Sequence, residues 1–228
     1  MSDFRAVVFD WRGTLVTTLS PEEWVRTALR RLGRNDRPMA VAGVVSAIVE
    51  AAGHPDRLDV PGIDCDAAFH RETFHRVFAD AGLDRQLADA LYAVESDAVH
   101  NPFAVDAVPV LRAVAEHGLR IAVVSDIHFD VRPAFAAAGI ADVITTYVLS
   151  YEHGVQKPDP AIFRRALDSL GTAPEQTLMV GDRYGYDGGG VDVGMATLLL
   201  PPLLDVRHER LDRVARLLGV PFSPSTPE

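Results

Sequence analysis

The spacing of apolar residues divides the chain into a helical stretch and a stretch in which strands and helices alternate. Residues 4–9 (Phe-Arg-Ala-Val-Val-Phe) are a short β-branched and aromatic run, which predicts a buried strand. Residues 17–101 instead carry apolar residues at helical spacing. Ser20 opens a capping box with Glu23, and Asp64 is the expected cap of a later helix. The helices predicted in this stretch are 21–32, 39–52, 65–80 and 84–99.

Beyond Pro102 the pattern alternates. The predicted helices are 106–117, 130–138, 159–170 and 206–218, and the predicted strands are 119–124, 143–149, 177–180 and 196–200. Repeated strand-helix-strand units indicate a parallel sheet covered by helices on both faces. The expected fold class is therefore α/β: a Rossmann-like core of residues 1–16 and 102–228, with an inserted α-helical cap domain of residues 17–101.

Composition narrows the range of partners. The net charge of −10 argues against a nucleic-acid backbone or an anionic membrane surface as the main partner. No run approaches the roughly 20 apolar residues of a membrane span, and the N-terminus does not resemble a signal peptide. Cys65 is the only cysteine, so an intrachain disulfide is excluded. We expect a cytoplasmic protein with no nucleic-acid or membrane partner, either a monomer or a homodimer.

Polar residues follow the predicted strands at the positions where a parallel sheet has its active sites. Asp10, Ser125 and Asp182 come directly after strands, Lys157 follows a short loop, and Asp187 lies five residues beyond Asp182. Clustered carboxylates repel one another and are costly to desolvate, so a bound dication is expected. Oxygen ligands without a nearby Cys or His pair favour Mg²⁺ over zinc. A carboxylate, a metal, a lysine and a hydroxyl around one point suit phosphoryl transfer.

Four segments resemble, in order, the motifs of the haloacid dehalogenase-like (HAD) superfamily. They are residues 7–15 (Val-Val-Phe-Asp-Trp-Arg-Gly-Thr-Leu), 122–125 (Ala-Val-Val-Ser), 154–160 (Gly-Val-Gln-Lys-Pro-Asp-Pro) and 180–187, which holds Gly-Asp and a later Asp. The resemblance covers residues 4–200 and implies a member with a helical cap after the first motif. It also implies a hydrolase, most simply a Mg²⁺-dependent phosphatase of a small phosphorylated metabolite that forms an aspartyl-phosphate.

The resemblance assigns roles to individual residues. Asp10 would be the nucleophile, and Ser125 and Lys157 would act on the phosphate. Thr14 and Asp126 would join Ser125 and Lys157 in binding the substrate. The implied metal ligands are Asp10, the backbone carbonyl of Arg12, Asp182 and Asp187, with Asp187 either a ligand or an anchor for the others.

Arg12 departs from the family pattern. The phosphatases of the family carry there a second Asp, which protonates the leaving oxygen and later activates water. Arginine keeps its proton at any working pH, so it cannot do either. Three readings stay open: a substrate with a good leaving group such as an acyl phosphate, another proton donor such as His128, or a slow or non-catalytic protein in which Arg12 binds an anion or pairs with a cap carboxylate. A carbon–halogen hydrolase is a further alternative, which the Asp182 and Asp187 pair disfavours.

Overall fold

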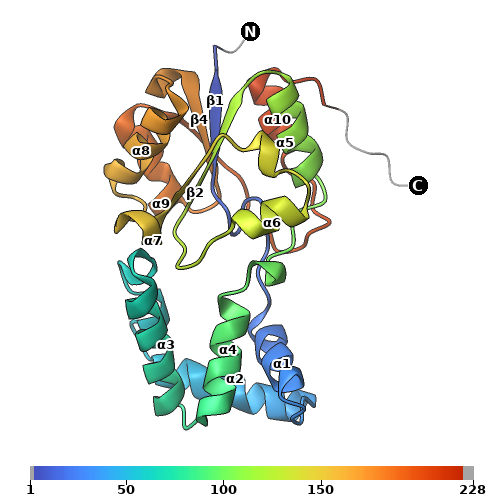
Figure 1. Cartoon of the computed structure of the whole chain (residues 1–228), viewed down its shortest axis with the longest axis vertical. Helices are drawn as coiled ribbons and strands as arrows, with labels where there is room; N and C mark the ends of the chain where they lie inside the picture. Colours follow the sequence, from blue (N-terminus) through green and yellow to red (C-terminus); the bar gives the residue numbers. More distant parts are fainter. Residues whose placement is uncertain (1–2, 223–228) are drawn as a thin grey trace, which may run out of the picture.

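The computed structural model describes residues 3–222 and contains a five-stranded parallel sheet with the order β3-β2-β1-β4-β5 (Figure 1). Each neighbouring pair is parallel. This confirms the predicted α/β class, with the strand that precedes Asp10 at the centre. The strands are β1 (Ala6–Phe9), β2 (Arg120–Ser125), β3 (Thr146–Leu149), β4 (Thr177–Gly181) and β5 (Ala196–Leu199).

Helices cover both faces of this sheet, which explains why the central strand is apolar at every position. Val7 and Phe9 pack into a cluster with α5 (Ala107–Glu116), α6 (Arg132–Ala137) and α10 (Asp212–Leu218). Ala6 and Val8 pack on the opposite face, against α8 (Pro160–Leu170). All four side chains are fully buried. Short helices α7 (Ser150–His153) and α9 (Tyr184–Asp187) follow β3 and β4.

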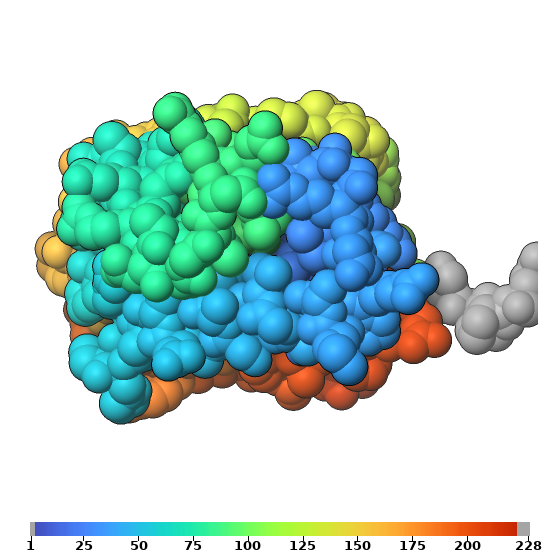
Figure 2. All heavy atoms as spheres, turned by 90° about the horizontal axis from the view of Figure 1, so that it is seen from below, coloured from blue at the N-terminus to red at the C-terminus, as the bar shows by residue number. Residues whose placement is uncertain are grey.

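Four helices lie beyond the end of the sheet at which Asp10 is found (Figure 1). They are α1 (Pro21–Arg31), α2 (Pro38–Ala52), α3 (Ala67–Asp80) and α4 (Arg85–Glu95). Their apolar side chains form a cluster of their own, separate from the two on the sheet. Seen from below, their atoms spread across much of that end of the molecule (Figure 2). We propose that they form the cap, with the domain boundaries predicted above.

One predicted helix cap and the bounds of two predicted elements are wrong. Asp66, not Asp64, caps α3, because its carboxylate accepts from the backbone N–H groups of Ala68 and Phe69. Asp64 instead lies in a short 3-10 helix and faces a cavity. The helix expected at 84–99 ends at Glu95, and the strand expected at 143–149 begins at Thr146. A short 3-10 helix, Ala98–His100, follows the end of α4, and another, Ala141–Val143, precedes β3.

The last predicted helix, 206–218, begins only at Asp212. Tertiary hydrogen bonds hold the preceding segment in another conformation. The Asp106 carboxylate accepts from the backbone N–H groups of Arg210 and Leu211. The Arg210 guanidinium donates to the carbonyl of Thr14 at 2.5 Å. No helix within residues 3–222 has the length and apolarity that a bilayer span would need.

Candidate active site

Asp10 lies at the end of β1, beside a cavity between the sheet edge and the helical layer. Its backbone N–H donates to the carbonyl of Val180 at 2.9 Å, and the residue is only 6% exposed. The cavity has a volume of about 210 Å³. The sheet side of its wall includes Asp10, Ser125, Asp126 and Lys157, and the helical side includes Ile63, Asp64, His70 and Phe74.

Lys157 is a buried ammonium held between two carboxylates. Its Nζ lies 2.5 Å from Oδ1 of Asp10 and 2.6 Å from Oδ1 of Asp187. Burial alone would lower the pKa of Lys157, but Asp10, Asp187 and Asp126 together raise it, so the group stays charged. Burial, reinforced by Asp187 and Asp182, raises the pKa of Asp10 to about 7 although Lys157 opposes the shift. Lys157 alone therefore does not offset the effects that disfavour the ionised form of Asp10, and further positive charge would stabilise that form.

Asp187 organises the loop after β4. Its Oδ2 accepts from the backbone N–H groups of Asp182 at 3.0 Å and Arg183 at 2.9 Å. A Cβ at position 181 would lie 2.2 Å from Cγ of Asp187, so only Gly181 leaves room for this carboxylate. Since both oxygens of Asp187 already accept hydrogen bonds, it is the least free of the nearby carboxylates to bind an ion.

Three carboxylates converge at this edge. Asp10, Asp182 and Asp187 each offer an oxygen within 4.8 Å of the others. Burial, followed by the charge of Asp187, raises the pKa of Asp182. Oδ2 of Asp10 is buried and has no hydrogen-bond partner among residues 3–222. One ammonium offsets three carboxylates only in part, so the residues present fit a hard divalent cation with oxygen ligands.

The other predicted substrate-binding residues lie close by. Ser125 ends β2 and is 1% exposed, and Asp126 is held by the backbone N–H of Lys157 at 2.9 Å. Burial raises the pKa of Asp126 to about 6. Thr14 does not line the cavity, and its hydroxyl donates to Oδ1 of Asp182 at 3.4 Å. Its role in substrate binding stays a prediction.

Arg12 turns toward the helical layer. Its Nη1 lies 2.7 Å from Oε1 of Glu95, and its Nη2 donates to the Glu95 carbonyl at 3.2 Å. Its Nε donates to Oδ1 of Asn101 at 3.4 Å, and the guanidinium stands over the Phe129 ring at 5.5 Å. This agrees with the reading in which Arg12 pairs with a cap carboxylate. Nothing local to Glu95 in the sequence marks it as the partner.

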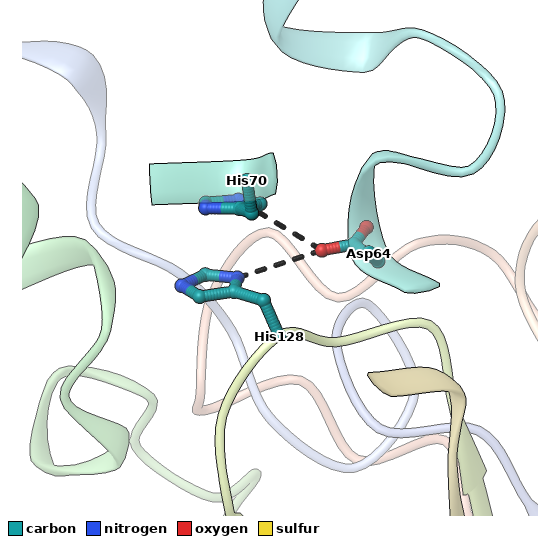
Figure 3. Close-up of side chains that lie close together, drawn as sticks. All are labelled: Asp64, His70 and His128. Carbon is teal, nitrogen blue, oxygen red and sulfur yellow. Dashed lines mark ion pairs between the residues drawn. The ribbon is translucent and has the colours of Figure 1, made fainter. Parts of the chain in front are cut away.

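A second polar cluster was not foreseen. Asp64 and His70 from the helical layer meet His128 from the loop after β2 (Figure 3). In the structure His70 stacks on His128, with ring centroids 3.4 Å apart.

Comparison with known proteins agrees with this architecture. The model of the haloacid dehalogenase-like hydrolase family matches residues 4–189. The chain belongs to this family. A phosphoserine phosphatase of Thermus thermophilus is 32% identical over 156 residues, 62% of this chain and 61% of that protein. A phosphoglycolate phosphatase of Rhodospirillum rubrum is 32% identical over 181 residues, 78% of this chain and 71% of that protein.

Other HAD relatives match less of their length or share the fold alone. The chain matches 41% of a glyceraldehyde 3-phosphate phosphatase of Methanopyrus kandleri, at 36% identity over 95 residues that make up 41% of this chain. It therefore spans less than two thirds of the phosphoserine and glyceraldehyde 3-phosphate phosphatases. The crystal structure of a HAD phosphatase from Thermococcus onnurineus superposes with a TM-score of 0.62 at 23% identity, covering 95% of this chain and 99% of that one. A dehalogenase gives 0.67 at 20% identity, over 95% and 98%.

Proposed function

We propose that this HAD-family protein is a Mg²⁺-dependent phosphatase that acts on a small phosphorylated metabolite through an aspartyl-phosphate. The observation that carries the proposal is the state of the Asp10 carboxylate. Lys157 holds one of its oxygens, and the other, Oδ2, is buried without a partner beside a cavity. An oxygen in that position is free to bond to phosphorus. The phosphatases among the relatives support the same class of reaction.

Each residue at the edge of the sheet has a separate role in the proposed reaction. Asp10 attacks the phosphorus, Lys157 offsets the negative charge of the attacking carboxylate, and Ser125 donates to a phosphate oxygen. Asp126, which shares the cavity wall, accepts from the substrate. Asp10, Asp182 and the backbone carbonyl of Arg12 would hold Mg²⁺, with Asp187 anchoring Lys157 and the Asp182 loop. When bound, the ion neutralises charge on the phosphoryl oxygens.

Arg12 limits the choice of substrate. Its guanidinium is hydrogen-bonded to Glu95 and stays protonated, so it cannot donate a proton to the leaving oxygen. The leaving group of an acyl phosphate needs no proton, so Asp10, Ser125 and Lys157 would suffice for its reaction. A phosphate ester of an alcohol needs a proton from another group in the cavity wall. Because Arg12 pairs with Glu95 and cannot transfer a proton, a second candidate function is a binding protein with very slow turnover.

A substrate panel tests the proposal. Phosphate release from phosphoserine, phosphoglycolate, glyceraldehyde 3-phosphate and acetyl phosphate is measured with Mg²⁺ and with EDTA, and chloride release from 2-chloropropionate is measured alongside. We expect Mg²⁺-dependent phosphate release that Asp10→Asn abolishes. The control Asp142→Asn, at an exposed position, keeps the wild-type rate. Turnover that survives Asp10→Asn would refute the nucleophile, and Mg²⁺-independent chloride release would favour a dehalogenase.

A further inference from the structure

Two imidazole rings and a carboxylate meet where the helical layer touches the sheet core. Oδ1 of Asp64 lies 3.5 Å from Nδ1 of His128 and 3.9 Å from Nε2 of His70. Figure 3 shows this oxygen directed at the same edge of both stacked rings. His70 and His128 are 3% and 4% exposed. Two elements of the helical layer and one loop of the core thus contribute one ligand-type atom each.

The outer nitrogens of both rings already have hydroxyl partners. Nε2 of His128 lies 2.9 Å from Oγ of Ser96, and Nδ1 of His70 lies 3.3 Å from the Tyr92 hydroxyl. When the rings donate to these hydroxyls, the lone pairs of the inner nitrogens face Asp64. Three acceptors then lie close together, and a shared proton or a bound cation would offset their repulsion.

Both contacts of Asp64 with the rings are longer than an ordinary hydrogen bond. An N–H···O bond brings nitrogen and oxygen to about 2.7–3.2 Å, shorter than both contacts of Asp64. Nδ1 of His128 is buried with no hydrogen-bond partner in the described chain. Zn–N and Zn–O bonds of about 2.0–2.2 Å place the ligands of a tetrahedral ion roughly 3.3 Å apart, close to the observed 3.5 and 3.9 Å.

We propose that Asp64, His70 and His128 bind a divalent transition-metal ion such as Zn²⁺, at a site distinct from the carboxylate cluster. Two imidazoles and a carboxylate favour Zn²⁺, Co²⁺ or Ni²⁺ over Mg²⁺. Neutral imidazole is the form of histidine that ligates such ions. Ser96 and Tyr92 then orient the rings from behind.

Binding requires a change of ring orientation. The rings are 14° from parallel, and an imidazole lone pair lies in the plane of its ring. An ion between them is reached only when each ring turns about its Cβ–Cγ bond, a torsion with broad energy wells. The ion would tie the helical layer to the core, because the cap supplies two ligands and the loop after β2 supplies the third.

The site would also act on the reaction, an extension that rests on the proposed function. Asp64 and His70 line the cavity, so an ion held by them borders the space for the leaving group. Water on such an ion has a pKa of about 7. Asp64, His70 and His128 would hold the ion, and its bound water would supply the proton that the leaving oxygen takes up when the bond from Asp10 to phosphorus forms and the ester P–O bond breaks. Arg12 cannot make that transfer.

Metal binding is tested on the whole, chelator-treated chain in excess Mg²⁺, which occupies the carboxylate cluster. We expect one Co²⁺ per chain by equilibrium dialysis, with the intense visible absorption of a tetrahedral site, and displacement by Zn²⁺. His70→Phe and His128→Phe keep the stacked rings but remove a ligand nitrogen, and should weaken binding by at least about 100-fold. The control His75→Phe, on the same helix, should bind normally.

Two outcomes would overturn the site: no stoichiometric Co²⁺ or Zn²⁺ binding by the wild-type chain, or binding that both Phe variants leave unchanged. The first outcome is measured on the wild-type chain alone. If a Phe variant misfolds, His128→Asn replaces it, and a far-UV circular dichroism spectrum checks that this variant is folded. Asp10→Asn should bind Co²⁺ normally although inactive, so failure of the phosphatase proposal is seen separately. Removing the ion should slow alkyl phosphate hydrolysis and spare acetyl phosphate. Equal slowing of both would refute the proton-donor role.

Discussion

Nη1 of Arg12 lies 2.7 Å from Oε1 of Glu95, and this ion pair joins the segment after Asp10 to the end of α4. The side chains are 28% and 24% exposed, so water screens the pair only in part. The guanidinium is also bound to the Glu95 carbonyl and to Asn101. Arg12 thus connects the core to the helical layer at the position where the family's phosphatases place a proton-transfer group.

The first prediction concerns the strength of this connection. A double-mutant cycle of Arg12→Gln and Glu95→Gln, followed by urea unfolding, should give a coupling free energy of about 1 kcal/mol, because the pair is half-buried and multiply bonded. The exposed pair Arg76–Glu72 on α3 is the control and should give less than about 0.5 kcal/mol. A coupling free energy for Arg12–Glu95 no larger than that of the control pair would show that this ion pair does not stabilise the contact between the core and the helical layer.

The second prediction concerns turnover on phosphate esters. Arg12→Asp alone places a second carboxylate near Glu95, and their repulsion opposes the packing of the helical layer on the core. Arg12→Asp with Glu95→Gln removes that repulsion and should raise kcat on alkyl phosphate esters by about 10-fold or more. Arg12→Asn with Glu95→Gln is the matched control, since an amide cannot transfer the proton. An equal gain in the control would show that proton transfer is not what limits the enzyme.

The third prediction follows from the pKa of Asp10, which rises from its ordinary value near 3.8 to about 7 in the folded chain. The folded state then binds a proton that the unfolded state releases, so this group's contribution to stability falls as pH rises from about 4 to 7. The free energy of unfolding of metal-free protein should decline by at most about 1.4 kcal/mol per pH unit from this source.

Mg²⁺ should flatten that dependence, since the ion binds the ionised carboxylates, and Asp10→Asn should remove it. Urea unfolding at pH 5 and pH 7.5, with Mg²⁺ or EDTA, measures both effects. A decline of the same size in Asp10→Asn would assign the titration to another group.

The fourth prediction separates backbone strain from crowding of the site. Gly13 has φ +82°, and a Cβ there would lie 2.4 Å from Oδ2 of Asp182. Gly118 has φ +86° and nothing within 4 Å of the same position. Both Gly→Ala variants should lose about 1–2 kcal/mol of stability from the left-handed backbone. Only Gly13→Ala should also lose activity and Mg²⁺ affinity, and equal activity in the two variants would contradict a crowded Asp182.

The sequence by itself determined the sheet and the residues at its carboxyl edge. Apolar runs mark the strands, and parallel strands bring their last residues to one edge whatever surrounds them. For that reason Asp10, Ser125 and Lys157 could be placed together before any coordinates. The motifs along residues 4–189 also sufficed for the family.

Only the tertiary structure decided the contacts of the helical layer. Three contacts join segments that are far apart in the chain. They are the ion pair of Arg12 with Glu95, the stacking of His70 on His128, and the hydrogen bond of Arg210 to Thr14 in the segment before α10. No local periodicity encodes such pairs, because they depend on how the helical layer packs on the sheet edge. The residues that would select the leaving group therefore emerged from packing, while those that would attack the phosphate followed from strand order.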